Sequence, residues 1–368
     1  SHRVHAIREL WLDDKLAWTA AGGIQGEYLG YLGVEGYTEG SAANAKNISA
    51  RMGSSRRYTG LAWLYLRFKL TGNSKSAESP FASGVPTRVT VVGDGAYVYD
   101  PRLDSTVPGG AGSCRAGNQA TWVWNGSSNR NPALGLLWYL LGYRINGKLA
   151  VGRGIPANRI DMQSFITAAN LCDEPVAKSA GGTEPRYRCD AVWSEGDDPS
   201  TVIDALKASM NADLDDVGGK LRLTVFHNDL ASPVAHFGDD EIIGPLNWEQ
   251  TPPLDQTFNI VRGTYTDASS TSLYQQVDYP QVSLASVDEI DRIDTFNLPF
   301  VQSASQAQRL AKQRLQRQQF GGTLSTTFDI TGWRVLKNDV VTISSTVMGW
   351  TNKLFRVAEI EFNTDGTV

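Results

Sequence analysis

Several features that define common classes of protein are scarce in this sequence. Its 368 residues include only three cysteines and four histidines. Three cysteines in a chain of this length do not form the disulfide framework of a small secreted domain. No run of residues approaches the roughly 18 consecutive apolar residues that a membrane-spanning helix requires. The sequence therefore excludes a disulfide scaffold, and we predict no membrane-spanning segment.

An excess of positive charge is also absent, since 34 lysines and arginines face 39 aspartates and glutamates and leave a net charge of −5. Without a basic surface, general binding to nucleic acid phosphates is not expected. Glycine is abundant, with 36 residues, and so is tryptophan, with 10, which fits many turns and large packed aromatic surfaces. The length allows two or three domains. The chain begins at Ser1 without an initiator methionine, which is compatible with a segment of a longer protein.

The histidines and cysteines do not have the spacing of a metal site. No HExxH motif and no pair of histidines on one helical face occurs, so we expect surface or hydrogen-bonded histidines. Cys172 and Cys189 fall on a predicted helix and a nearby predicted strand. We expect two buried free thiols there, and a disulfide between them stays open. Cys114 has no histidine near it in sequence to make it a nucleophile. The histidines are His2, His5, His227 and His236.

Paired acidic residues are the remaining candidates for chemistry, since two carboxylates can hydrolyse glycosides and several can bind calcium. Most pairs fall at predicted turns or helix ends, where carboxylates bind backbone N–H groups. No calcium loop of the form D-x-D-x-D-G occurs, and no glycine-rich loop leads into GK[ST] for phosphate. We therefore predict no catalytic residue, no cofactor and no metal. The pairs are Asp13-Asp14, Asp173-Glu174, Asp197-Asp198, Asp215-Asp216 and Asp239-Asp240-Glu241.

The clearest helix signals lie in residues 131–176. Asn131-Pro132 reads as an N-cap followed by proline at the first helical position, and Gly142 ends this helix. Asp161 caps a second helix whose apolar residues fall on one side. Further helices are predicted after Asp198-Pro199 and over residues 303–319. The last helix carries Arg309, Lys312, Arg314 and Arg317; we expect a solvated charged face on a helix that lies on a sheet, with a nucleic-acid role as the alternative.

Strand patterns occupy most of the remaining chain, which predicts an α+β, β-rich fold. The best strand of the front half, residues 61–70, alternates an aliphatic face with an aromatic-to-basic face. We expect a hairpin over residues 88–99 that turns at Gly93-Asp94-Gly95. Long irregular connections are predicted over residues 20–55 and 107–129, the latter anchored at its centre. Other predicted strands are residues 6–13, 185–192, 220–226, 258–265, 323–330, 339–344 and 354–362.

A set of short motifs occurs in one fixed order along nearly the whole chain. NPAL at Asn131 precedes FITAANLCDEPV, and GW-x-N-K at Gly349 precedes FRV near the end. Their order resembles the tail-tip attachment proteins of long-tailed phages, the protein J type of lambda-like siphophages, and is similar to the "megatron" hub of gene transfer agents. Asn338 stands where the family usually has glycine. The other motifs are VYDPR at Val98, N-x-V-R-G-x-Y at Asn259, Asp278-Tyr279-Pro280 and Asp339-Val340-Val341.

The resemblance implies a structural virion protein, the central hub of the tail tip or baseplate, with no enzymatic activity. It implies β-barrel-like hub domains at residues 1–130 and 241–368 that flank a small α/β module at residues 131–240. The expected partners are two further copies in a homotrimer ring, distal tail and tail-tip proteins, the tape measure protein and tail fibres, with DNA only in transit. The expected location is the virion tail tip, after assembly in the bacterial host cytoplasm.

Two other functions remain open, namely a receptor- or glycan-binding module and a tail-associated cell-wall or polysaccharide hydrolase. An exposed Tyr/Trp platform would indicate the first, and a paired-carboxylate cleft the second. Aromatic residues in the two predicted loops are our candidates for subunit or partner contacts, because aromatics anchor interfaces. The alternative is that these rings pack on their own domain. The candidates are Tyr28, Tyr31, Tyr37, Trp122 and Trp124.

Overall fold

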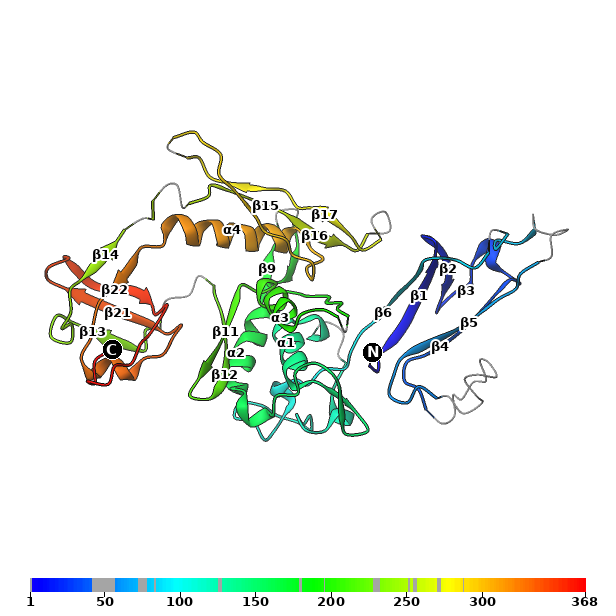
Figure 1. Cartoon of the computed structure of the whole chain (residues 1–368), viewed down its shortest axis with the longest axis horizontal. Helices are drawn as coiled ribbons and strands as arrows, with labels where there is room; N and C mark the ends of the chain where they lie inside the picture. The colour runs from blue at the N-terminus through cyan, green and yellow to red at the C-terminus, as the bar shows by residue number, and fades with distance from the viewer. Residues whose placement is uncertain are drawn as a thin grey trace. The chain divides into compact units, whose positions relative to one another are not determined.

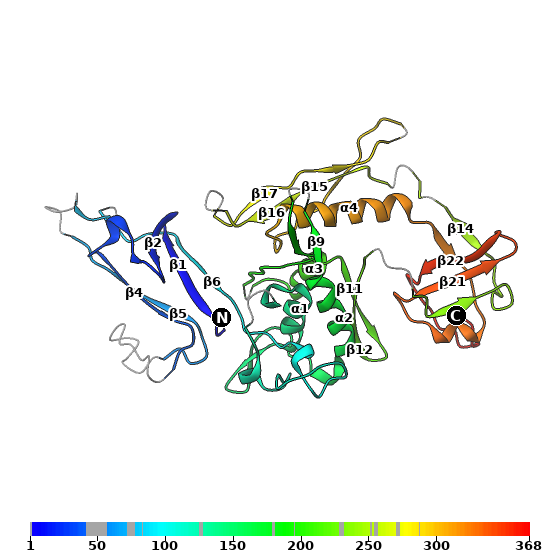
Figure 2. The same ribbon diagram turned by 180° about the vertical axis from the view of Figure 1, so that it is seen from behind.

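The computed structural model describes residues 2–41, 57–71, 78–82, 84–124, 128–178, 181–194, 196–227, 232–250, 252–253, 257–269, 273–286 and 288–368. They fall into two compact units, Ser1–Arg130 with Leu134–Ala157 and Asn131–Ala133 with Asn158–Val368. Figures 1 and 2 show the elements from opposite sides. The predicted α+β, strand-rich class is confirmed: within the described residues, four α-helices accompany sheets of two to four strands, and no sheet closes into a barrel.

The first unit begins with an antiparallel sheet in the order β3-β2-β1-β6. β1 and β2 are joined by Asp13 and Asp14, which both have positive φ, of 46° and 64°. Two central residues with positive φ are typical of a tight hairpin whose twist matches the strands. The predicted strand and Asp-Asp turn are thus confirmed. The bounds are β1 (Ala6–Leu12), β2 (Lys15–Thr19), β3 (Gly23–Ile24) and β6 (Val89–Asp94).

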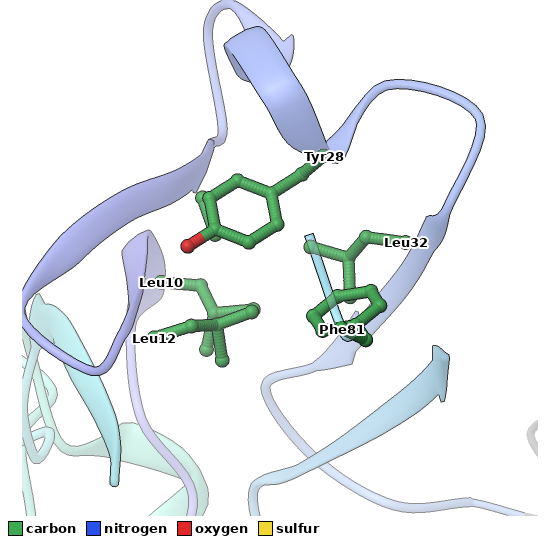
Figure 3. Close-up of a cluster of buried hydrophobic side chains, with 6 residues drawn as sticks. Leu10, Leu12, Tyr28, Leu32 and Phe81 are labelled. Atoms are coloured by element: carbon green, nitrogen blue, oxygen red, sulfur yellow. The ribbon is translucent and has the colours of Figure 1, made fainter. Parts of the chain in front are cut away.

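A two-stranded ribbon, β4 (Leu32–Tyr37) with β5 (Trp63–Phe68), packs against this sheet. Figure 3 shows the side chains that meet between them, drawn from β1, from the 3-10 helix η1 (Gly26–Tyr28), from β4 and from the segment at Phe81. Leu10 and Leu12 are no more than 1% exposed. We call this packing of sheet and ribbon the first β lobe.

β4 corrects a prediction, because it lies inside the connection expected to be irregular over residues 20–55. Gly33 and Gly36 lower the strand propensity of this segment. Pairing with β5 and burial of Leu32 and Val34 in the lobe core compensate for that loss. The tertiary contacts therefore decide the local structure. Residues 42–55 of the predicted connection lie outside the described residues.

The predicted hairpin over residues 88–99 is wrong. Gly93 and Asp94 pair with β1, opposite Ile7 and Ala6, so they belong to a strand instead of a turn. Val98 bridges to Val123, which confirms that the loop over residues 107–129 is anchored at its centre. This region is otherwise held by three short 3-10 helices: η4 (Pro101–Leu103), η5 (Gln119–Thr121) and η6 (Ser128–Arg130).

The first predicted helix is α1 (Pro132–Leu141), with Asn131 accepting from the N–H of Ala133 as its cap. Gly142 follows with φ +74°. A Cβ at that position would lie 2.5 Å from a methyl of Leu149 and 2.9 Å from a backbone oxygen of Val151. Only glycine meets both conditions, so the predicted end of the helix is confirmed. A short hairpin of β7 (Tyr143–Ile145) and β8 (Lys148–Val151) follows.

The second unit carries the other predicted helices, and two of them begin at an aspartate. Asp161 caps α2 (Met162–Asp173) and Asp198 caps α3 (Pro199–Ala208) by accepting a backbone N–H. β11 (Ala212–Val217) and β12 (Lys220–Val225) form a hairpin, so Asp215 and Asp216 lie on a strand and not in the predicted turn. The predicted strand over residues 185–192 is also wrong. Only its first residue belongs to a strand; the other elements are η7 (Ala157–Arg159), β9 (Pro175–Ala177) and β10 (Thr183–Pro185).

The long polar helix α4 (Ala304–Phe320) starts at the cap Ser303, as predicted. It lies along β15, β16 and β18 (Figures 1 and 2), with Ala307, Leu310, Ala311 and Leu315 buried. Within the part of the chain that the structure describes, no helix has the length and apolar character needed to cross a membrane. The strands near α4 are β15 (Ile260–Arg262), β16 (Thr264–Asp267), β17 (Gln275–Asp278), β18 (Val282–Ser283) and β19 (Ile293–Thr295).

The predicted strand over residues 258–265 is divided into β15 and β16 by Gly263. A Cβ on Gly263 would lie 2.1 Å from the carbonyl oxygen of Phe296. The glycine of the N-x-V-R-G-x-Y motif therefore permits two backbones to approach. Asn259 of the same motif accepts the backbone N–H of Arg292 at 2.7 Å. Both motif residues thus serve the packing of this sheet.

The last sheet in the chain has three strands. β21 (Val340–Ser345) lies between β13 (Ala235–Phe237), which is parallel to β21, and β22 (Trp350–Arg356), which is antiparallel to β21. β14 (Asn247–Glu249) pairs with β20 (Thr323–Ser325) beside it. The predicted strand over residues 323–330 ends at Ser325, and the 3-10 helix η9 (Ile330–Arg334) follows. The last strand begins at Trp350 instead of Leu354. We call these five strands, η9 and the loop of residues 335–339 that joins η9 to β21 the terminal β lobe. Its buried core consists of Phe237, Val335, Val341 and Ile343.

Candidate interaction surfaces

Two of the five predicted contact residues are buried in their own unit. Tyr28 is 6% exposed and packs beside Phe81 in the first β lobe. Trp122 is 4% exposed, and its indole N–H donates to the carbonyl of Arg115 at 3.1 Å. In the isolated chain both rings pack within their own unit, and their role in subunit or partner contacts stays a prediction.

The other three predicted residues keep part of their surface. Tyr37 stacks on Trp63 with ring centroids 4.4 Å apart, and Trp124 stacks on His5 at 4.7 Å. Tyr31 borders the core of the first β lobe, with the ammonium of Lys69 5.8 Å from its ring. Tyr28 and Tyr31 share the core of the first β lobe, whereas Tyr37, Trp122 and Trp124 belong to separate local contacts.

The face of the β4–β5 ribbon opposite the lobe core carries three aromatic side chains. Its cross-strand neighbours are Tyr37 with Trp63 and Glu35 with Tyr65, and Arg67 lies 3.6 Å from Glu35. The alternate residues of β5 face the core, as the two-faced pattern of residues 61–70 predicts. We call this surface the aromatic face; it consists of Glu35, Tyr37, Trp63, Tyr65 and Arg67.

At least one member of each acid pair is bound by a group of its own unit. Asp13 accepts backbone N–H groups of Thr87 and Arg88. Glu174 pairs with Arg186 at 2.6 Å, and Asp239 accepts from Thr346. Among the residues that the structure describes, no group of three or more His, Cys, Asp or Glu side chains is placed to hold a metal. These carboxylates thus carry out the turn and capping roles expected of them.

Three of the basic side chains of α4 also contact other groups of the protein. Arg309 pairs with Glu184 at 2.5 Å, and Arg314 with Asp294 at 2.5 Å. Arg317 lies over the ring of Phe226 at 4.7 Å. A helix whose arginines bind carboxylates and a ring does not present a free basic stripe. This arrangement favours the structural interpretation of the helix over a DNA-binding one.

The tyrosines of the two motifs VYDPR and Asp-Tyr-Pro are buried. The hydroxyl of Tyr99 donates to Asp104 at 2.8 Å, and that of Tyr279 donates to the carbonyl of Phe296 at 2.9 Å. Burial, with the nearby charge of Asp294, raises the pKa of Tyr279 to about 12. Burial and the bond to Asp104 raise the pKa of Tyr99 further still. Both phenols are therefore hydrogen-bonded structural groups and cannot serve as acids near neutral pH.

All three cysteines are free thiols and buried. Cys172 is 0% exposed and Cys189 is 6% exposed, which confirms the expected burial without a disulfide. Burial raises the pKa of the Cys114 thiol above its usual value. A thiol that is buried and held protonated is a poor nucleophile.

A charged contact joins the β11–β12 hairpin to the loop before β21. Lys337 lies 3.1 Å from Asp213 and 2.5 Å from Asp215. The amide of Asn338 donates to Asp215 at 2.5 Å. Asn338 has φ +71°, a conformation that glycine and asparagine tolerate best. The departure from the glycine of the family pattern is therefore compatible with the backbone and adds a hydrogen bond.

The GW-x-N-K motif at Gly349 contributes to a cage of aromatic rings around the ammonium group of a lysine. The ammonium of Lys353 lies 4.1 Å from the ring of Trp248 and 4.2 Å from that of Trp350. The ring of Phe355 is 5.5 Å away. Such distances give attractive cation–π contacts. Three residues come from the GW-x-N-K and FRV motifs, and the fourth, on β14, lies about a hundred positions earlier and has no sequence signal that relates it to them.

Comparisons with known proteins agree on one class. Residues 198–360 match the model of the family Phage-tail_3, described as "Putative phage tail protein". The fold is similar to a chain of "Virion of native gene transfer agent (GTA) particle", with a TM-score of 0.57 and 14% identity over 98% of this chain and 73% of that chain. No curated protein sequence matches. The chain is thus similar to phage tail proteins in its second unit and to a virion component in its fold.

A partial likeness exists to the tail protein from Neisseria meningitidis MC58. It has a TM-score of 0.33 and 14% identity, and covers 49% of this chain and 53% of that chain. Together the family match and the shared fold support a structural role in a phage-type tail.

Proposed function

We propose that this chain is a structural protein of a phage-type tail and that it forms the central hub of the tail tip. The observation that carries the proposal is the family match over residues 198–360. The similarity of fold to a gene transfer agent virion chain extends it to nearly the whole sequence. The order of motifs from Val98 to Val357 adds the tail-tip position, because it resembles that of hub proteins.

The chemistry of the chain fits a structural role. Its carboxylates and arginines bind one another or cap backbone groups, as Glu174 with Arg186 and Arg309 with Glu184 illustrate. Side chains in such pairs stabilise the fold, and they do not place a general acid opposite a general base. We expect the working state to be a cyclic ring, since a hub that continues a hollow tube requires contacts that close around an axis. The resemblance to tail hub proteins supplies the expected number of three copies.

The test is electron cryo-microscopy of tails that carry a short tag in the turn at Val347, which is 85% exposed. We expect tag density in three copies at the tail end, with the untagged particle as control. One or six copies would contradict the trimer. Tag density at the neck or along the tube would contradict the hub, and particles that lack the chain altogether would contradict the structural role.

We also propose that the chain does not turn over peptidoglycan or capsule. Asp173 and Glu174, the acid pair at the end of α2, both pair with arginines of the next segment, Arg188 and Arg186. The assay is release of reducing sugar by the purified chain. Turnover that disappears in Asp173→Asn or Glu174→Gln, with the fold preserved, would establish the hydrolase alternative instead.

The aromatic face favours a second candidate function, the binding of a surface polysaccharide. Stacked tryptophan and tyrosine rings such as Trp63 and Tyr37 offer apolar area with polar rims to a sugar ring. Binding of host polysaccharide is expected to fall in Trp63→Ala and to persist in Trp333→Ala, whose ring is exposed on the terminal β lobe. Equal binding in both variants would remove this candidate.

A further inference from the structure

The terminal β lobe has an apolar core of its own. The buried members of that core are Phe237, Val335, Val341 and Ile343. The partly buried residues that pack on it are also drawn from residues 235–360, and none of its described members belongs to β11 or β12. A group of strands that closes its own core folds as a body and needs only surface contacts to its neighbours.

The contacts between this lobe and the β11–β12 hairpin are charged. On the hairpin, Asp213 and Asp215 both bind Lys337. Arg222 on the neighbouring strand binds Asp339 at 2.9 Å, and that carboxylate is the acidic residue of the Asp339-Val340-Val341 motif. Lys207, at the end of α3, adds a longer contact of 3.8 Å to Asp213.

The ring of Phe226, directly after β12, completes the contact. The guanidinium of Arg317 on α4 lies 4.7 Å from it, and that of Arg356 on β22 lies 5.1 Å from it. Arg356 also donates to the carbonyl of Asn338 at 2.9 Å. Cations therefore surround the end of the hairpin on both the helix and the lobe side. Interactions of this kind are weakened by salt, whereas an apolar core is not.

We propose that Lys337, Asn338 and Asp339 form a charge latch that holds the terminal β lobe, as a separable body, on the β11–β12 hairpin. The latch consists of these residues with Asp213, Asp215 and Arg222. When its ion pairs are screened or removed, the lobe leaves the hairpin with its own strands intact. The proposal concerns this chain alone and does not depend on the tail function.

The experiment measures the distance between the two bodies by double electron–electron resonance. Spin labels are placed at Lys220→Cys on the hairpin and Val347→Cys on the lobe, two exposed positions, and the three buried native cysteines do not compete for the label. At low salt the native latch gives one narrow distance population. Lys337→Met, which keeps the length of the stem, raises the population of other distances by about fivefold, the effect of losing an ion pair worth roughly 1 kcal/mol.

The matched control is a pair of neighbouring residues on β11. Asp215→Asn removes a latch carboxylate, whereas Asp216→Asn removes the adjacent one, which faces Arg159 at 3.8 Å and is 57% exposed. We expect broadening with the first and none with the second. Raising the salt to about 1 M, where charges are screened within roughly 3 Å, should broaden the native distribution as well.

Three outcomes would overturn the latch. The first is an unchanged distance distribution in folded Lys337→Met. The second is broadening by Asp216→Asn that equals the effect of Asp215→Asn, which would indicate general weakening of the hairpin. The third is loss of lobe structure when the latch is broken, detected as a change in tryptophan fluorescence from Trp248 and Trp350, because the lobe would then not be a separate body.

Discussion

The first and terminal β lobes are both small packings of strands, but they are held together in different ways. The first lobe buries Leu10, Leu12 and Leu32 between a sheet and a ribbon, and its charges lie at the rim. Among the described residues, the terminal lobe has a core of four buried side chains, and it adds the cage around Lys353 and the charged contact at Lys337. In a lobe with a small apolar core, the contacts of cations hold the lobe in its position and orientation. These contacts are directional and sensitive to salt.

The largest effect is expected from opening either core. Leu10→Ala and Phe237→Ala remove side chains that are 0% and 2% exposed, and each should lower the free energy of unfolding by about 3 kcal/mol. Denaturant titration with hydrogen exchange should place the loss in the first lobe for one variant and in the terminal lobe for the other. Leu29→Ala, at a position 70% exposed, is the control and should change little. A loss shared equally by both lobes would show that they do not fold independently.

The next effect concerns the left-handed backbone at Asn338. Asn338→Ala loses the bond to Asp215 and places at φ +71° an alanine, which tolerates this conformation less well than asparagine does, for a cost of about 2 kcal/mol. Asn338→Gly loses only the bond and should cost about half as much, because glycine adopts this conformation freely. The measurement is the free energy of unfolding of the terminal lobe. If alanine were tolerated better than glycine, backbone strain would not govern this position.

A smaller effect is expected at the cation cage. Lys353→Met keeps the stem and removes the ammonium that lies near Trp248 and Trp350, so we expect a loss of about 1 kcal/mol. A double-mutant cycle with Trp248→Ala should show that the two losses are not additive. Lys312→Met, at an exposed position of α4, serves as the control. Additive losses would mean that the ammonium and the indole act separately.

The last prediction concerns the loss of stability at acid pH, which is the smallest of these effects near neutral pH. Burial alone would raise the pKa of Asp104, but hydrogen bonds from Thr106 and Tyr99 and the charge of Arg115 lower it overall. Burial would also raise the pKa of Asp213, but the hydrogen bond and the charge of Lys337 outweigh burial, so this pKa is lowered overall. A depressed carboxylate pKa contributes stability above the unfolded value and loses it as the pH falls through the folded one.

Stability should therefore be flat with pH above about pH 5 and fall below it. Asp104→Asn should flatten the acid limb of the first unit, and Asp213→Asn that of the second. Unit-specific hydrogen exchange at a series of pH values checks this. A slope between neutral pH and pH 5 would assign the pH dependence to another group.

The division into domains at residues 1–130, 131–240 and 241–368 stays a prediction. β13 lies before residue 241 and pairs with β21 of the terminal lobe, so limited proteolysis with mass analysis of the fragments is the measurement that would place the boundary. Sequence periodicity gives the elements on each side of such a boundary, but does not show which of them share a core.

The sequence by itself determined the helices of this protein. Asn131, Asp161, Asp198 and Ser303 each cap a helix where the sequence places one. A cap, a proline and an apolar stripe act within a few residues of one another, so their signal is local. The burial of Cys172, on the apolar side of α2, follows from the same kind of pattern.

Only the tertiary structure decided how the strands pair and what the motif residues contact. β4 forms because β5 covers its glycine-rich backbone, and Asp215 meets Lys337 across a separation of 122 residues. The partners of Lys353 and the close approach at Gly263 arise in the same way. Strand pairing and charge pairing join segments that are distant in the chain, and the residues that select one partner over another carry no local signal of that choice.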